Sequence, residues 1–386
     1  MLMQEQHYDV VICGAGPAGL TAALALHNSD LRVLLLEKGD NSTEKICGGA
    51  LAPYIPKVLN TIDPAFSDAF HQWAPKQPVN TCRVSSSMKN AVDFIFSQTG
   101  WICKRSDFDK FLLELVLRLP NVTYMAGKKV IDVTQHGNSI KVRTQSNETF
   151  SGTLLIACDG AGSITKKKLL NTGLNKKHHA TAVRAYFSGV QGMNENTFEL
   201  HFLKQLNPGY LWIFPINKTL TNVGIGLPTK TVISKRMNMK KLLKQIIEDH
   251  PILKQRFSKA FQTTEIIGSG LPLNMSAQPI SGDRFMLCGD AGSLIDPLTG
   301  EGIGQAMVSG RYAGWQAIEC FKQHQFHGQF MKQYDEVVNN KLLNTHLRHA
   351  ALIKKIDRFP FLLSLGLYWA KHSKSFHQRV IQHFEV

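Results

Sequence analysis

The sequence predicts an α/β fold: a parallel sheet with a nucleotide-binding turn, interrupted by an inserted antiparallel-sheet domain and followed by a helical C-terminus. Three observations predict it. A strand–helix–strand unit with a glycine-rich turn lies in the first forty residues, a run of short alternating strands occupies the middle, and the last hundred residues are mainly helical in pattern.

The N-terminal unit is defined by two apolar runs around an Ala/Leu-rich stretch. Residues 8–13 are a short β-branched run, residues 17–27 carry the helical stretch, and residues 31–36 form a second apolar run that ends at Glu37. Two strands joined by a helix in so short a stretch form a βαβ unit, so a parallel sheet begins here.

The turn inside this unit, Gly14-Ala15-Gly16-Pro17-Ala18-Gly19, is a GxGxxG fingerprint. Gly14 permits the tight turn, Gly16 lets the backbone approach a pyrophosphate, and Gly19 lets the helix pack close to the strand. The helix N-terminus offers N–H groups to phosphates, and Glu37 can accept hydrogen bonds from a ribose diol. A glycine-rich turn of some other α/β protein is the alternative, but the flanking strand, helix and carboxylate favour a dinucleotide. The predicted cofactor-binding residues of this unit are Gly14, Gly16, Pro17, Ala18, Gly19, Glu37 and Lys38.

The rest of the chain divides into regions that differ in composition and in the spacing of apolar residues. Residues 40–105 are expected to be irregular because they are rich in Pro and Ser, and a helix is expected from about Ser106. The remaining expected elements are meander strands at 130–134, 140–144 and 154–158, antiparallel strands at 182–190, 197–202, 210–215 and 222–227, and a basic helix at 239–248. The expected domains are a discontinuous dinucleotide-binding domain (1–80, 100–175 and 280–340), a substrate domain (81–99 and 176–279) and a helical C-terminal segment (341–386).

Two further turns distinguish FAD from NAD. Asp159-Gly160 directly follows a predicted strand, and Gly289-Asp290 follows another. A carboxylate beside a glycine at a strand end suits the ribityl hydroxyls of a flavin. The glycines at Gly300 and Gly302 allow a later helix to begin close to a planar ring, where its N-terminus can stabilise negative charge as the ring is reduced.

Together these three turns resemble the three signatures of the flavin monooxygenase and geranylgeranyl reductase superfamily, in the same order, over all but the last forty residues. The resemblance implies a Rossmann-like, glutathione-reductase-like domain that binds FAD, with Glu37 on the adenosine ribose and Asp290 on the ribityl chain. Arg105 resembles the arginine those families place near the ribityl phosphate, although an ordinary surface charge is the alternative. The further cofactor-binding residues expected are Cys47, Gly48, Arg105, Asp159, Gly160, Gly289, Asp290, Pro297, Gly300, Gly302 and Ile303.

Two segments resemble the geranylgeranyl reductases in particular. Residues 45–51, Lys-Ile-Cys-Gly-Gly-Ala-Leu, resemble their Lys-x-Cys-Gly-Gly-x-Leu segment, and residues 209–215, Gly-Tyr-Leu-Trp-Ile-Phe-Pro, resemble their Gly-Tyr-x-Trp-x-Phe-Pro strand. The implied reaction reduces a carbon–carbon double bond of an isoprenoid or other apolar substrate by hydride transfer from reduced flavin N5. Cys47, Tyr210 and Trp212 are candidates for the substrate pocket, and the first two are candidate proton donors. Simple core packing is the alternative for these aromatics.

Three other functions stay open. One is an FAD monooxygenase that uses a flavin hydroperoxide on an aromatic or polyketide-like substrate. A flavin halogenase fits less well, because Tyr210 stands where the Trp-x-Trp-x-Ile-Pro segment of those enzymes begins. The third is a non-catalytic flavin electron carrier. A single GxGxxG leaves no separate NAD(P)H domain, so NAD(P)H must visit transiently or a ferredoxin-like protein must reduce the flavin.

Composition and charge limit the classes of molecule that the protein can bind. There are 44 Lys and Arg against 29 Asp and Glu, so the surface attracts anions, but no nucleic-acid motif accompanies this charge. The seven scattered cysteines indicate neither a disulfide framework nor a metal site. No signal peptide and no apolar run of about 20 residues is recognisable, so we expect a cytoplasmic protein. The basic, aromatic segment 341–386 can either lie on an anionic membrane surface or close the substrate domain, and the second interpretation is slightly favoured.

Overall fold

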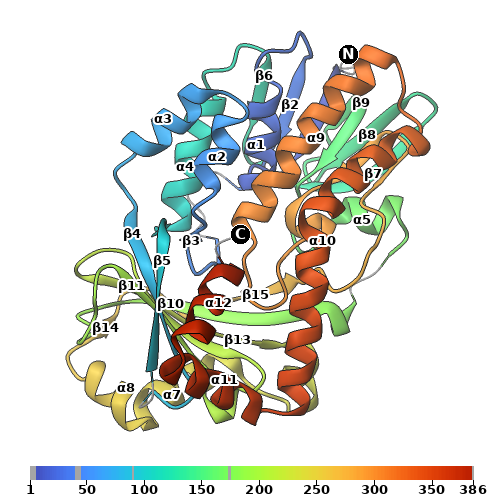
Figure 1. Ribbon diagram of the computed structural model, residues 1–386. Coiled ribbons are helices and arrows are strands. Elements are labelled where there is room, and N and C mark those ends of the chain that lie inside the picture. The colour runs from blue at the N-terminus through green and yellow to red at the C-terminus, as the bar shows by residue number, and fades with distance from the viewer. Residues whose placement is uncertain (1–5, 40–44, 89–90, 173–174, 385–386) are drawn as a thin grey trace.

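The computed structural model describes residues 6–39, 45–88, 91–172 and 175–384. Two β-sheets and a group of C-terminal helices build this part of the chain (Figure 1). Sheet A contains the predicted parallel strands, and sheet B is the inserted layer, which is almost entirely antiparallel. The expected α/β fold with an inserted sheet and a helical C-terminal part is confirmed.

Sheet A carries the βαβ unit at its centre. Its parallel strands lie in the order β17 (Phe285–Leu287), β9 (Thr149–Ala157), β1 (His7–Cys13), β2 (Val33–Leu36) and β6 (Val122–Met125). At its edges, β16 (Ser281–Gly282) pairs with β17, while β7 (Val130–His136) and β8 (Ser139–Thr144) form the expected meander with β9. All four residues of β2 are buried, as expected for a parallel strand covered on both faces.

Small residues bring two helices of this domain into close contact. α1 (Pro17–Ala25) follows β1, and α9 (Ile303–Gln323) packs along it. A Cβ on Gly310 would lie 2.1 Å from the carbonyl oxygen of Ala18, and one on Gly314 would lie 2.6 Å from the Cβ of Ala25. The two helices therefore pack with their backbones nearly touching. The domain is completed by α4 (Arg105–Val116), α5 (Ile164–Leu169) and the 3₁₀ turn η3 (Gly289–Gly292).

The expectation of an irregular stretch at 40–105 was wrong. The described part of this stretch contains β3 (Ala50–Leu51), α2 (Ile55–Asn60), α3 (Pro64–Gln72), β4 (Gln77–Ser85) and β5 (Ala91–Ile102). The prolines begin helices here rather than break them. Pro64 is the first residue of α3, directly after Asp63, whose side chain accepts a hydrogen bond from the Ala65 N–H at 2.8 Å. Proline in the first helical turn loses no hydrogen bond, because that N–H has no partner within the helix.

Sheet B contains all four antiparallel strands predicted for the middle of the chain. It comprises β10 (His179–Ser188), β11 (Thr197–His201), β12 (Tyr210–Pro215), β13 (Leu220–Pro228), β14 (Phe261–Gln262) and β15 (Ile267–Pro272), together with β3, β4 and β5. β11 pairs in parallel with β4, which joins residues 77–102 to the inserted strands in one sheet. The connecting helices are α6 (Thr229–Ser234), α7 (Met239–Asp249), α8 (Pro251–Arg256) and the 3₁₀ turns η1 (Lys176–His178) and η2 (Lys204–Leu206).

The two faces of sheet B have different partners. On the outer face, Leu211 and Ile213 of β12 belong to a core shared with α7 and α8. On the inner face, Trp212 and Phe214 of the same strand belong to a separate aromatic cluster. The alternation expected for this strand is therefore present, and it points the aromatic set toward sheet A and the C-terminal helices.

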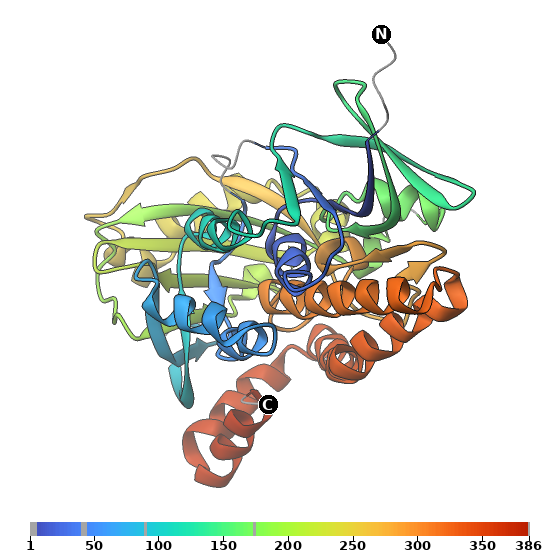
Figure 2. The same ribbon diagram turned by 90° about the horizontal axis from the view of Figure 1, so that it is seen from above.

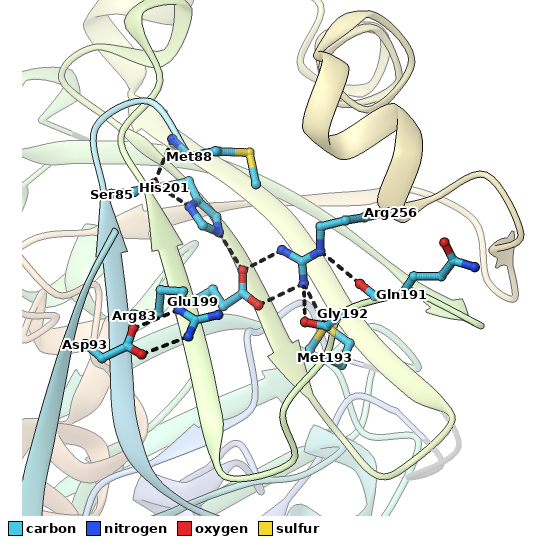
Figure 3. A network of polar contacts seen from close by, with 10 residues as sticks. All are labelled: Arg83, Ser85, Met88, Asp93, Gln191, Gly192, Met193, Glu199, His201 and Arg256. Carbon is cyan, nitrogen blue, oxygen red and sulfur yellow. Dashed lines mark hydrogen bonds and ion pairs between the residues drawn. The ribbon is translucent and has the colours of Figure 1, made fainter. Parts of the chain in front are cut away.

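A buried ionic network ties α8 to the outer face of sheet B (Figure 3). Glu199 of β11 accepts hydrogen bonds from both terminal nitrogens of Arg256, at 2.7 and 2.8 Å, and contacts His201 Nε2 at 2.8 Å. The His201 ring contacts the Ser85 hydroxyl at 2.7 Å. Burial acts against ionisation of Glu199, but His201 and Arg256 outweigh it and lower the pKa of Glu199 to about 2. The network holds α8 against β11, on the side of sheet B opposite the aromatic cluster.

The C-terminal helices extend from sheet A to sheet B. α10 (Gly328–Arg358) begins beside β16 and runs without a break past residue 341. α11 (Phe361–His372) and α12 (Lys374–Phe384) follow and project at one side of the molecule (Figure 2), packed against β5. In the residues that the structure covers, no helix is both long and apolar enough to cross a bilayer.

Candidate active site

A cavity of about 2710 Å³ runs from the turns at the carboxyl ends of the sheet A strands, along the inner face of sheet B, to α11 and α12. Ligands of open parallel sheets bind at this end of the strands. Most of the predicted site residues line this cavity, which we call the groove. They are Gly14, Gly16, Pro17, Ala18, Glu37, Lys38, Cys47, Gly48, Arg105, Asp159, Gly160, Tyr210, Trp212, Asp290, Pro297, Gly300, Gly302 and Ile303.

Two predicted residues lie behind the groove wall instead. A Cβ on Gly19 would lie 1.9 Å from the Gly14 carbonyl oxygen, so this glycine serves the contact of α1 with β1. Gly289 has a φ of +55°, and its Cβ would meet the Cβ of Ala306 at 3.0 Å. Both glycines permit close packing and do not line the groove.

The fingerprint turn has an open position for a phosphate. Gly14 has a φ of +105°, and a Cβ there would lie 2.2 Å from the Cys158 carbonyl oxygen, so the turn requires glycine. At Gly16, by contrast, the atoms nearest a Cβ are Lys45 Nζ at 3.7 Å and an Arg105 terminal nitrogen at 3.9 Å. The space in front of Gly16 is thus bounded by two cationic groups at the N-terminus of α1.

Glu37 is buried at the end of β2 and held in place by backbone donors. Its Oε2 accepts a hydrogen bond from the Ala15 N–H at 2.6 Å, and its Oε1 accepts one from the Gly39 N–H at 3.3 Å. Each carboxylate oxygen has a further lone pair for a ribose hydroxyl.

Arg105 is anchored by a carboxylate one helical turn away. Its Nε donates to Asp109 Oδ1 at 2.8 Å and a terminal nitrogen donates to Oδ2 at 3.2 Å, while Lys45 Nζ lies 3.0 Å from the same Oδ2. Burial acts to raise the pKa of Asp109, but Arg105 and Lys45 outweigh it and hold that pKa below its ordinary value. Two cations and one carboxylate leave a net positive charge beside Gly16, which suits a pyrophosphate.

The two acidic turns supply carboxylates that a flavin nucleotide would satisfy. Asp159 Oδ2 accepts hydrogen bonds from the N–H and hydroxyl of Thr165, whereas its buried Oδ1 has no hydrogen-bond partner among the described residues. Burial raises the pKa of Asp290 to about 6, although the charge of Arg105 opposes the rise. Hydroxyl donors of a ribityl chain would compensate such carboxylates. The open turn, the cationic pair and these two carboxylates together fit FAD.

The loop before α9, residues 295–302, lines the groove and is held by contacts with other parts of the fold. The Tyr210 hydroxyl donates to the Thr299 carbonyl oxygen at 2.8 Å, and Leu273 forms an isolated parallel bridge with Ile295. Asp296 Oδ1 accepts from two N–H groups of its own loop, and its Oδ2 lies 2.6 Å from the His349 ring on α10. The loop is therefore fixed by contacts from three directions.

The segment that carries Cys47 and Gly48 is held against sheet B by one amide. Asn222 donates to the carbonyl oxygens of Cys47 at 2.8 Å and Gly48 at 3.0 Å, and it accepts from Trp212 Nε1 at 3.0 Å. A Cβ on Gly48 would lie 3.0 Å from the Phe214 ring, so glycine lets this segment lie close to the aromatic face without displacing that ring. The indole N–H is satisfied by Asn222, and the buried Trp212 side chain lines the groove.

Several functional residues were missed from the sequence. The Arg105-x-x-x-Asp109 spacing is a recognisable helical ion pair and was overlooked. Lys45 begins the segment 45–51, and Glu301 lies between the predicted Gly300 and Gly302, but neither was assigned a role. Asn222 carried no recognisable signal, because the segment that it holds lies 174 to 175 residues away in the chain. No cluster of three or more His, Cys, Asp or Glu side chains suited to a metal is present in the described ranges.

The fold and the groove define the class: a flavoprotein oxidoreductase in which the turns at the carboxyl ends of the parallel strands would hold FAD. The model of the family described as FAD binding domain matches residues 7–337, and the chain belongs to this family.

Three known proteins resemble the chain over most of its length. A digeranylgeranylglycerophospholipid reductase of Thermoplasma volcanium is 28% identical over 361 residues, which cover 90% of this chain and 87% of the relative. The crystal structure of a geranylgeranyl bacteriochlorophyll reductase-like protein from Thermoplasma acidophilum is 26% identical, with a TM-score of 0.78 and coverage of 92% and 88%. A flavin-dependent brominase shares the fold, with a TM-score of 0.79 at 21% identity and coverage of 98% and 94%. The expected resemblance to the reductase and monooxygenase superfamily is confirmed.

Proposed function

We propose that the protein uses reduced FAD to saturate carbon–carbon double bonds of an isoprenoid or other long apolar substrate. The observation that carries the proposal is the groove, which continues from the cofactor turns along an apolar wall. Its volume of about 2710 Å³ exceeds the ~300–1,000 Å³ of typical ligand pockets, so it can hold the cofactor and a second large ligand together.

The wall beyond the cofactor turns is apolar and elongated. β5 contributes Phe94 and Phe96, and β11 contributes Phe198 and Leu200. The opposite side is closed by α11 and α12. Such a wall binds hydrocarbon chains by burying apolar area and offers few groups that would orient a polar substrate. The names of the two reductase relatives point to the same substrate class.

Bound FAD would supply the hydride, because the cofactor carries the redox chemistry. The chain's own part is to bind, orient and exclude water. Lys45, Arg105 and Glu37 would hold the nucleotide, Asn222 holds the Cys47 segment, and the aromatic face of β12 would align the alkene. We also propose that NAD(P)H or a ferredoxin-like protein reduces the flavin transiently, since the net charge of +15 favours an anionic donor.

The test is anaerobic photoreduction of the FAD-loaded protein, followed by separate addition of a geranylgeranyl lipid in detergent and of oxygen. Fast reoxidation by the lipid with formation of a saturated product supports the proposal. Fast reaction with oxygen, a hydroperoxide-type absorbance and no reaction with the lipid would support a monooxygenase instead.

A matched pair of variants on β5 links the activity to the groove. Phe96→Arg places a charge in the apolar wall and should raise KM for the lipid strongly, because a buried charge opposes hydrocarbon binding. Ile95→Arg, at the neighbouring position that is 62% exposed, is the control and should leave KM unchanged. Equal effects of both variants would argue against the apolar wall as the substrate site.

We further propose that α11 rests on an anionic membrane surface from which the substrate enters. Its inner side buries Leu367 and Ala370 against Phe94, whereas Phe361, Tyr368 and Trp369 are more than half exposed. Basic residues flank this exposed face, at Lys354, Lys355, Arg358, Lys371, Lys374 and Arg379. This combination of aromatic and basic side chains is typical of helices that lie in a bilayer interface.

Co-sedimentation with vesicles containing phosphatidylserine tests the membrane contact. Replacing Tyr368 and Trp369 by Asp should abolish binding, whereas Val337→Asp, on the exposed side of α10, should not. Retention of binding by the Tyr368/Trp369 variant would refute this part of the proposal.

A further inference from the structure

A half-buried acid–hydroxyl pair lies in the groove wall and has no assigned role in cofactor binding. The Tyr54 hydroxyl donates to Glu301 Oε1 at 2.6 Å and also contacts Gln305 Oε1 at 3.2 Å. The Gln305 amide donates weakly to Glu301 Oε2 at 3.4 Å. The carboxyl group is thus held between the segment before α2 and the first turn of α9.

The pair lies between the two halves of the site. Glu301 is flanked by Gly300, whose Cβ would meet the Tyr210 hydroxyl at 2.9 Å, and by Gly302, whose Cβ would lie 3.8 Å from Asp290 Oδ1. Tyr210 belongs to the substrate wall and Asp290 to the expected flavin site. Glu301 therefore lies between the residues expected to hold the flavin and those proposed to contact the substrate.

The charges around this carboxyl favour its protonated form. Burial is the largest influence and raises the pKa of Glu301 to about 7; the hydrogen bond from Tyr54 opposes the rise, and the negative charge of Asp296 adds to it. His346 and His349 of α10 contact Asp296 rather than Glu301. A group of this pKa near neutral pH both releases and regains a proton readily.

The other candidate donors fit less well. The Tyr210 hydroxyl is engaged with the Thr299 carbonyl oxygen, and burial raises the pKa of Tyr210. The Cys47 Sγ accepts a hydrogen bond from the Gly49 N–H at 3.4 Å, and Cys47 is among the groups that interact with Arg105. The Cys47 sulfur is thus already engaged by a backbone donor and by the Arg105 guanidinium.

We propose that Glu301 is the acid that protonates the substrate carbon during double-bond reduction, with Tyr54 as its positioning residue. This inference rests on the proposed function. The C=C π bond breaks, one carbon forms a bond to the hydride delivered by the cofactor, and the other carbon forms a bond to the Glu301 proton. The alkene gains two electrons, which an external two-electron donor has supplied to the flavin. The carboxylate then regains a proton from solvent.

The first test observes the proton itself. Infrared difference spectra of the FAD-loaded protein, wild type minus Glu301→Gln, should show the carbonyl band of a protonated carboxylic acid at pH 6 that titrates near pH 7. Because the Tyr54 hydrogen bond lowers the pKa of Glu301, Tyr54→Phe should move the titration midpoint to higher pH, and the pH profile of reoxidation should move with it. A carboxyl already ionised at pH 6 would overturn the inference.

The second test separates the two half-reactions. Glu301→Gln should slow reoxidation of the reduced protein by a geranylgeranyl lipid about 100- to 10,000-fold, the usual contribution of a general acid. Reduction by dithionite should proceed at the wild-type rate. Glu319→Gln, at a solvent-facing position of α9, is the control and should change neither rate.

The outcomes distinguish the two levels of the argument. A wild-type protein that reacts with the lipid while Glu301→Gln reacts equally fast would overturn the inference alone. A wild-type protein that is reduced normally and ignores the lipid would refute the proposed function, and the role of Glu301 with it.

Discussion

Gly16→Ala should weaken FAD binding strongly while leaving the apoprotein nearly as stable as the wild type, whereas Gly19→Ala should weaken the fold itself. The two glycines belong to one fingerprint and are three residues apart. In the structure they face opposite ways: Gly16 toward the groove and Gly19 toward β1.

The magnitudes follow from the space at each position. Gly16 has φ −87° and ψ −176°, which alanine adopts freely, and its nearest neighbours lie at ordinary contact distance. The apoprotein should therefore lose less than about 1 kcal/mol of unfolding free energy, through the poorer N-cap. A pyrophosphate pushed off the turn would lose about two charge-assisted hydrogen bonds, or about 3 kcal/mol, which is ~150-fold in Kd.

At Gly19, in contrast, the added Cβ lies 1.9 Å from the Gly14 carbonyl oxygen and 3.2 Å from an Ile12 methyl carbon. Backbone must shift to relieve the first contact, so the apoprotein should lose about 1–3 kcal/mol or more, the usual range for overpacking.

Urea unfolding of the apoproteins gives the free energies, and quenching of FAD fluorescence gives Kd. Gly19→Ala is expected to bind FAD in proportion to its folded fraction. A Gly16→Ala protein that binds FAD as tightly as wild type would show that the pyrophosphate does not approach this turn, and the assignment of the groove to FAD would be wrong.

Three further predictions follow from single side chains. Burial raises the pKa of Asp290 to about 6, so this side chain is a carboxylate above that pH. Ribityl hydroxyls donate best to a carboxylate, and the FAD affinity should therefore fall as the pH drops through 6. Asp290→Asn should abolish this pH dependence in fluorescence titrations. Glu199→Gln should cost about 3–5 kcal/mol in urea unfolding, because it leaves Arg256 without its carboxylate partner, and exposed Glu195→Gln is the control. Since the pKa of Glu199 is lowered to about 2, the stabilisation is complete above pH 5 and is lost as the pH falls toward 2. Asn222→Leu should release the Cys47 segment and raise KM for the lipid, whereas an unchanged KM would show that this anchor is dispensable.

The features that sequence analysis predicted correctly are those encoded locally. The βαβ unit, its glycine-rich turn and the alternating strand at 210–215 each depend on residues within about thirty positions, where backbone geometry and periodicity decide the outcome. The prediction for residues 40–105 was wrong because proline disrupts the interior of a helix but is tolerated in its first turn, where Pro64 lies.

The contacts that sequence analysis missed join distant positions. Glu199 lies on a strand where alternation alone would allow an exposed carboxylate, yet it is buried because Arg256 reaches it from 57 residues along the chain. Tyr54 and Glu301 are 247 residues apart, and nothing local to either indicates the other. The first pair depends on the packing of α8 against sheet B and the second on the packing of α2 against α9, and no periodicity specifies either.

The position of the insertion explains why one loop can serve both halves of the reaction. The chain leaves sheet A after β9, builds most of sheet B, and returns through β17 to form the loop before α9. On its return this loop is bonded to the substrate wall through Tyr210 and to the C-terminal helices through the contact of Asp296 with His349. A ligand that displaced the wall would therefore act directly on the backbone beside Glu301. The same loop, residues 295–302, leads into α9, whose first residue Ile303 lines the groove, so Glu301, the aromatic wall and the proposed flavin site are positioned together by one short segment.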